Sequence, residues 1–191
     1  VIFQETSSTV IAPDYGNIQV SPLNDGGDDP GPGIEIVLGD EMSVTGDGIY
    51  AFSNLVLGFR VTPAVPDKLI KDNWLAIGDV TFDNTIEDLG VAVLEWVGTA
   101  PGADDLAEKY VERSWLFADP IFDTGPDSAS FGLQQEIYVT KNILVWATDP
   151  DETAVLGTVS QRFSQQAVPE PATALLFGLG LFGAGLARRR R

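Results

Sequence analysis

The segment EIYVTKNILVWATDPDETAVLGTVSQRF, residues 136–163, decides the predicted fold. It holds two runs of aliphatic, aromatic and Thr residues, at 136–147 and 154–163, and these residue types favour strands. Between the runs lies DPDE, residues 149–152, where the proline presets φ and the aspartates can bond back to the backbone. The segment therefore predicts a turn between two strands, which we interpret as a C-terminal hairpin.

Short strand-like runs separated by Gly, Pro, Asn and Asp continue through the rest of the chain. One stretch differs: ADDLAEKYVER, residues 103–113, has acids in its first turn, Arg113 at its end, and Leu106 and Tyr110 four positions apart, which favours a helix. The prediction is an all-β, sandwich or jelly-roll-like domain with one short helix. The further strands are expected at 1–5, 16–20, 33–38, 51–62, 74–82, 91–97 and 129–131.

The amino-acid composition excludes several classes of function. The 191 residues contain 28 acids and 11 bases, a net charge of −17, and such a surface repels nucleic acid. The chain has no Cys and no His, so the usual nucleophiles, general bases and zinc ligands are missing. We expect no catalytic residues and no enzymatic activity, and a hydrolase with paired carboxylates is the remaining enzymatic alternative.

The tail AVPEPATALLFGLGLFGAGLARRRR, residues 167–191, has a different composition from the acidic body. Sixteen uncharged residues span about 24 Å as a helix, somewhat short of a hydrocarbon core of about 30 Å. The arginines that follow favour the cytoplasmic side. We therefore expect an exported acidic domain at 1–165 and, at 166–191, a linker, a short transmembrane helix and a basic stop. The helix includes Ala172, Leu175, Leu176, Phe177, Leu179, Leu181, Phe182, Leu186 and Ala187, and the stop is Arg188, Arg189, Arg190 and Arg191.

The order Val168, Pro169, Glu170, Pro171, apolar run and terminal basic cluster resembles the PEP-CTERM sorting domain that exosortases recognise in Gram-negative bacteria. The resemblance covers residues 168–191. It implies export, inner-membrane anchoring with the body on the periplasmic side, cleavage near the triplet, and release to the cell surface or an exopolysaccharide or biofilm matrix. A chain that begins at Val1 is consistent with removal of a secretory signal. In the alternative interpretation the helix is retained, and the domain is an accessory subunit of a membrane assembly.

Two sets of residues are candidates for ligand binding, and both also have a purely structural interpretation. Six turn acids offer the oxygen ligands that calcium requires, or are simply solvated. Four tryptophans could stack on sugar rings, or could belong to the core. A carbohydrate- or calcium-binding surface module is therefore an alternative function, with calcium the one cofactor considered. The acids are Asp25, Asp28, Asp29, Asp149, Asp151 and Glu152, and the tryptophans are Trp74, Trp96, Trp115 and Trp146.

Overall fold

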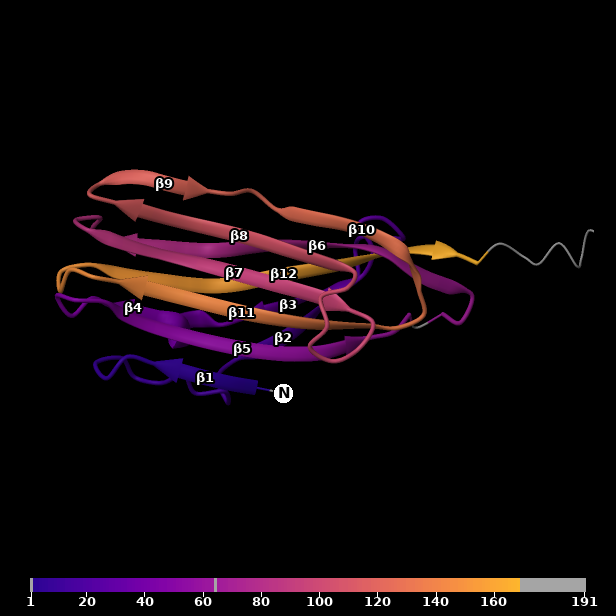
Figure 1. Cartoon of the computed structure of the whole chain (residues 1–191), viewed down its shortest axis with the longest axis horizontal. Helices are drawn as coiled ribbons and strands as arrows, with labels where there is room; N and C mark the ends of the chain where they lie inside the picture. The colour runs from indigo at the N-terminus through magenta and orange to yellow at the C-terminus, as the bar shows by residue number, and fades with distance from the viewer. Residues whose placement is uncertain (1, 64, 169–191) are drawn as a thin grey trace, which may run out of the picture.

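The computed structural model describes residues 2–63 and 65–168, which form two antiparallel sheets stacked face to face (Figure 1). The expected all-β sandwich is confirmed. Sheet A has the order β1-β5-β11-β7-β8-β9, and sheet B has the order β10-β6-β12-β3-β2 with β4 paired to β12. The strands are β1 (Ile2–Thr6), β2 (Gln19–Leu23), β3 (Gly33–Val37), β4 (Ser43–Thr45), β5 (Ala51–Val61), β6 (Lys68–Asp83), β7 (Asp88–Gly98), β8 (Ala107–Leu116), β9 (Asp119–Asp123), β10 (Asp127–Gln134), β11 (Ile137–Ala147) and β12 (Thr153–Ala167).

The predicted C-terminal hairpin is wrong, although both of its strands and its turn exist. The amide of Glu152 donates to the carbonyl of Asp149 at 3.0 Å, which closes the turn. However, β11 lies in sheet A between β5 and β7, whereas β12 lies in sheet B between β6 and β3. Both edges of β11 are occupied along its length, so β12 has no edge of that strand to pair with. The turn therefore carries the chain from one sheet to the other.

The predicted short helix is also wrong, because residues 107–116 form β8. Lys109 and Val111 point into the core, whereas Tyr110 between them is 45% exposed. This alternation with period two is that of a half-buried strand. Within the described residues the single helical element is the 3-10 turn Gly39–Met42. The expected membrane helix at 172–187 lies outside the described residues.

The space between the sheets contains two apolar clusters. The larger one includes Leu75, Val93 and Ile143, and the smaller one consists of Ile70, Val97, Ile137, Val139 and Phe163. The ring of Phe163 meets that of Phe59 edge to face, with centroids 6.5 Å apart, and this contact joins sheet B to sheet A. The two clusters are held apart by polar side chains.

The buried side chain of Glu152 stabilises the turn that carries the chain from sheet A to sheet B. Its side chain is fully buried, and its Oε1 accepts hydrogen bonds from the backbone amides of Ile86 and Glu87. Its Oε2 accepts a bond of 3.1 Å from the amide of Asp149. One carboxylate therefore satisfies donors on both the β6–β7 connection and the β11–β12 connection, which neighbour each other at this end of the sandwich.

We predict that Glu152→Ala lowers the free energy of unfolding by about 3 kcal/mol, because three backbone donors lose a buried acceptor. Urea denaturation of the full chain measures the effect. The matched control is Asp151→Ala in the same turn, where the exposed side chain predicts a change within about 0.5 kcal/mol. Equal losses in the two variants would contradict this role for Glu152.

Candidate functional sites

A layer of buried polar side chains crosses the interior of the sandwich between the two apolar clusters. It takes one residue from each of five strands, and each of these residues is at most 1% exposed. On β7, for example, Glu95 stands between Val93 of the larger cluster and Val97 of the smaller one. We call this set the polar layer: Asn73 on β6, Glu95 on β7, Lys109 on β8, Lys141 on β11 and Gln161 on β12.

Glu95 is the centre of the polar layer. Its neighbours in the register of sheet A are Lys109 on one side and Lys141 on the other. Its Oε1 lies 2.6 Å from Nζ of Lys109, and its Oε2 accepts from Nζ of Lys141. From sheet B, Nδ2 of Asn73 and Nε2 of Gln161 donate to Oε1 at 2.7 and 2.8 Å.

Asn73 completes the network, because its Oδ1 accepts from Nζ of Lys109 at 2.5 Å. Among the described residues, Oε1 of Gln161 is buried without a hydrogen-bond partner. The polar layer was not predicted from the sequence. The signal that could have found it is a polar residue at an inward position of each alternating strand.

The electrostatics of the polar layer follow from its burial. Desolvation alone would raise the pKa of Glu95, but the charges of Lys141 and Lys109 outweigh it and lower that pKa below its ordinary range. Burial lowers the pKa of Lys141, and its pairing with Glu95 opposes that shift only in part. The two lysines therefore favour the carboxylate form of Glu95, whereas burial works against the ammonium form of Lys141.

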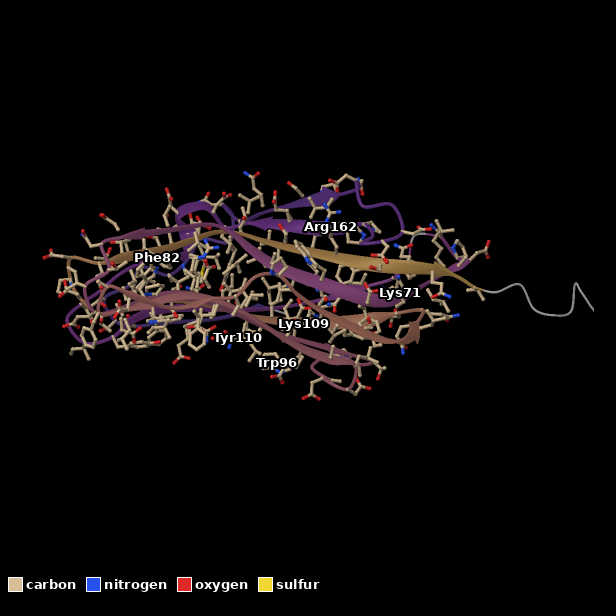
Figure 2. All side chains as sticks on the ribbon, turned by 90° about the horizontal axis from the view of Figure 1, so that it is seen from above. Lys71, Phe82, Trp96, Lys109, Tyr110 and Arg162 are labelled. Atoms are coloured by element: carbon tan, nitrogen blue, oxygen red, sulfur yellow. The ribbon has the colours of Figure 1, made fainter. Side chains whose placement is uncertain are left out.

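A second candidate site is a part of the outer face of sheet A where three aromatic residues lie on neighbouring strands. Trp96 lies between the buried residues Glu95 and Val97, so its side chain points outward, and Tyr138 lies likewise between Ile137 and Val139. The pairs Leu94–Tyr110, Thr140–Trp96 and Tyr138–Gly98 place Tyr110 and Tyr138 on the strands that flank Trp96. Figure 2, which views the two layers edge-on, shows Trp96 and Tyr110 on the outer side of one layer and Arg162 in the other.

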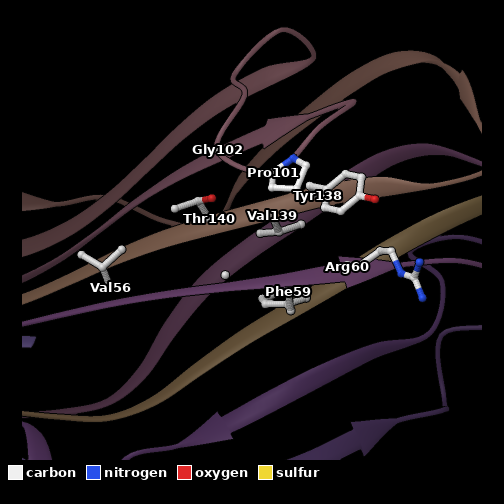
Figure 3. Close-up of a pocket in the computed structure, with 9 residues that line it drawn as sticks. Val56, Phe59, Arg60, Pro101, Gly102, Tyr138, Val139 and Thr140 are labelled. Carbon is white, nitrogen blue, oxygen red and sulfur yellow. The ribbon is translucent and has the colours of Figure 1, made fainter. Parts of the chain in front are cut away.

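A pocket of about 470 Å³ adjoins these aromatic residues (Figure 3). Val56, Gly58 and Arg60 of β5, together with Tyr138 and Thr140 of β11, form its floor. Pro101 and Gly102, from the connection between β7 and β8, line its side. Outside the sandwich this is a mostly apolar recess with an arginine at one end.

Carboxylates accept hydrogen bonds from the hydroxyls of both tyrosines of this face. The hydroxyl of Tyr110 donates to Glu112, whose other oxygen accepts from the hydroxyl of Ser114 at 2.6 Å. The hydroxyl of Tyr138 donates to Glu136 at 2.6 Å. Burial and the Glu112 carboxylate raise the pKa of Tyr110 far above its ordinary value, and the hydrogen bond to Glu136 raises the pKa of Tyr138. Both hydroxyls therefore remain protonated at neutral pH.

The other tryptophans have different positions. Trp115 packs against the larger apolar cluster, as the core interpretation predicted. Trp146 is only 8% exposed, and a Cβ added to Gly90 would come within 2.4 Å of its ring, so this ring covers Gly90 closely. Trp74 lies between buried Asn73 and Leu75 and so faces outward on sheet B. The four tryptophans do not form one platform.

The three candidate calcium ligands in the loop before β3 each pair with a base of sheet B. Asp25 meets Arg162 at 2.6 Å, and Asp29 meets Lys71 at 2.8 Å. Asp28 pairs with Lys68. These hydrogen bonds lower the pKa of Asp25 and of Asp29. The loop acids therefore fasten the loop to β6 and β12.

The remaining candidate calcium ligands lie at the opposite end of the sandwich. Asp149 accepts from the amide of Asp151, and Glu152 is the buried cap of the crossing turn. In the part of the chain that the structure describes, no three acidic side chains are placed to hold a metal ion. Calcium binding stays a prediction from the sequence.

Of the sorting residues, the structure describes Val168, whose amide donates to the carbonyl of Asp67 at 2.8 Å. Residues 169–191 lie outside the described part. A match to a known family covers residues 167–191, and that family is the PEP-CTERM protein-sorting motif. The chain carries this motif, as the sequence predicted, and the motif implies export and sorting by an exosortase. Across residues 2–63 and 65–168, no helix has the length and apolarity needed to cross a membrane.

Solved structures similar to the sandwich share little sequence with it. TmCBM61 in complex with β-1,4-galactotriose is 12% identical, with 87% of this chain and 88% of that chain covered and a TM-score of 0.29. The enzymatically active domain of bacteriophage CBA120 tailspike protein 4 is 10% identical, with 87% and 19% covered and a TM-score of 0.27. A carbohydrate-binding module from the β-sandwich superfamily is 11% identical, with 86% and 56% covered and a TM-score of 0.24. At such values the similarities carry no argument about ligands, and no curated protein matches the sequence.

We predict that Tyr110 ionises far above the ordinary tyrosine pKa of 10.0, and that Glu112→Gln lowers its pKa, because a neighbouring negative charge disfavours the phenolate. Absorbance titration of tyrosinate, with Tyr110→Phe to assign the step, measures the shift. The matched control is Glu136→Gln, which should lower the pKa of Tyr138 and leave that of Tyr110 in place. An unchanged Tyr110 titration in Glu112→Gln would contradict the assignment.

Proposed function

We propose that the protein is an exported, non-enzymatic component of the cell surface or extracellular matrix, delivered by an exosortase. The PEP-CTERM motif at residues 167–191 carries the proposal. The tail anchors the chain in the inner membrane with the body on the periplasmic side, and cleavage then releases the body. One structural feature supports release: β12 ends at Ala167, so cleavage at Pro169–Pro171 leaves every described strand of the sandwich in place.

The chemistry of the described residues supports a binding or structural role. The sequence has neither Cys nor His, and the acids that sequence reasoning singled out are engaged in ion pairs, backbone caps or turns. These contacts account for the loop and turn acids without any reaction. The alternative is an accessory subunit of a membrane assembly that keeps its C-terminal helix, and the length of the mature chain separates the two.

We predict that the protein isolated from its native host lacks the residues after the Pro169–Pro171 region. Intact-mass spectrometry of the mature protein measures this, and deletion of the host exosortase should leave the longer, membrane-associated chain. Replacing both Pro169 and Pro171 by Ala should have the same effect as the deletion. A mature chain that still ends at Arg191 in the wild-type host would favour the retained anchor instead.

The aromatic face of sheet A favours a second function, binding of a neutral polysaccharide. Trp96 and Tyr138 offer flat apolar surfaces beside an open pocket, and Thr140 and Arg60 add polar groups at the pocket wall. A net charge of −17 disfavours anionic polymers, so the expected ligand is an uncharged glycan. This function is compatible with a matrix protein and does not require the first proposal.

We predict that Trp96→Ala weakens binding to a neutral polysaccharide about tenfold, because it removes the central aromatic surface of the face. Affinity electrophoresis in gels that contain neutral β-linked polysaccharides measures the retardation of the folded protein. The matched control is Trp74→Ala on the outer face of sheet B, which should bind as the wild type does. The glycan proposal fails if the wild-type protein is retarded by none of the polymers, or if both variants lose binding equally.

A further inference from the structure

The polar layer brings an amine, a primary amide and a carboxylate into direct contact. Nζ of Lys109 donates to Oδ1 of Asn73 at 2.5 Å. The same oxygen of Glu95, Oε1, lies 2.6 Å from Nζ of Lys109 and accepts from Nδ2 of Asn73 at 2.7 Å. A carbonyl bond is about 1.2 Å long, so Cγ of Asn73 lies at most about 3.7 Å from Nζ of Lys109. This is the proximity that a reaction between the amine and the amide requires.

The charges of the polar layer favour a reactive amine. Lys109 and Lys141 are two bases around one carboxylate, and all three are buried. An unpaired ammonium in this interior is unfavourable, so one of the two amines tends to give up its proton. Glu95 touches both amines, so its carboxylate can pass a proton from Lys109 to Lys141, which leaves Lys109 neutral, Lys141 as the ammonium and Glu95 again a carboxylate. A neutral amine is a nucleophile, whereas an ammonium is not.

We propose that Lys109 and Asn73 condense to an isopeptide bond that cross-links the two sheets, with Glu95 as the catalytic acid and base. The amine nitrogen Nζ of Lys109 attacks Cγ of Asn73, and a tetrahedral intermediate forms. Oε1 of Glu95 takes a proton from Nζ and delivers it to Nδ2, with which it is also in contact. The Cγ–Nδ2 bond breaks, and the nitrogen leaves as ammonia.

The step balances without any other reactant. A primary amine and a primary amide become a secondary amide and ammonia, Glu95 returns to its starting state, and nothing is oxidised or reduced. The exclusion of water prevents it from competing with the amine for Cγ of Asn73, since Asn73 and Glu95 are fully buried and Lys109 is 1% exposed.

The consequence is a covalent tie between β6 in sheet B and β8 in sheet A. The chain has no cysteine, so the tie takes the place that a disulfide holds in other exported domains. It also closes a loop between positions 36 apart, 109 minus 73, which restricts the unfolded chain.

The test is the mass of the full chain produced in a host without an exosortase. The expected intact mass is lower than that of the sequence by one ammonia. No Lys or Arg lies between Lys71 and Lys109, so trypsin should leave Lys109 uncut and release residues 72–113 as one peptide, lighter by one ammonia. Further digestion at acidic residues should yield two chains joined through Asn73 and Lys109. A full sequence mass together with cleavage after Lys109 would overturn the proposal, and this test needs no variant.

Three variants test the roles of the residues. Glu95→Gln, Asn73→Ala and Lys109→Arg should each show the full mass calculated for its own sequence, because each lacks one participant. The matched control is Lys71→Arg, a change at an exposed ion pair of β6, which should keep the loss of ammonia. Circular dichroism checks the β-sheet content of each variant. If folded Lys109→Arg or Asn73→Ala still loses ammonia, the bond lies elsewhere and the proposal is overturned. If folded Glu95→Gln still loses ammonia, the catalytic role of Glu95 is overturned.

Discussion

The buried pairing of Glu95 with two lysines is the constraint on which the sandwich depends. An isolated charge in this interior would be strongly destabilising, so the three side chains must meet. They meet in only one register of β11, β7 and β8, because a slip by one residue turns a side chain to the other face of the sheet. Asn73 and Gln161 add the requirement that β6 and β12 of sheet B stand opposite the same point. The polar layer therefore sets register within one sheet and alignment between the two.

The errors in the predicted fold arise because strand pairing depends on contacts between residues far apart in the sequence. Residue types and turn chemistry predicted most strands correctly, because β-branched and aromatic runs between Gly, Pro and Asp follow local preferences. They could not predict which strands pair. The turn at 149–152 suits a hairpin as well as a crossing between sheets, and the choice depends on β5 and β7, which occupy both edges of β11. First-turn acids, a terminal arginine and the spacing of Leu106 and Tyr110 favour a helix at 103–113. Only the distant partner Glu95 makes Lys109 an inward residue of a strand.

The candidate sites also differ in whether their residues lie close together in the sequence. The sorting motif is local, so the sequence alone was sufficient to find it at the C-terminal end. The acids of the loop before β3 were correctly seen to cluster, but their partners Arg162, Lys68 and Lys71 are far away in sequence and appear only in the folded chain. The polar layer takes one residue from each of five strands, and no single segment carries its pattern. The sorting motif could therefore be predicted from the sequence, whereas the polar layer of the interior could not.

The distribution of the bases limits what the domain can bind. Of the 11 bases, four are Arg188–Arg191, so 11 minus 4 leaves seven in the body. Each of these seven forms an ion pair: Arg60, Lys68, Lys71, Lys109, Arg113, Lys141 and Arg162. The surplus acids therefore dominate the field around the sandwich, and no base of the described residues stands apart from a carboxylate. An anionic polymer would have to break an existing ion pair for each contact with a base, whereas a neutral glycan on the aromatic face would break none. This charge pattern thus disfavours nucleic acid, which is also a polyanion, and favours uncharged or cationic partners.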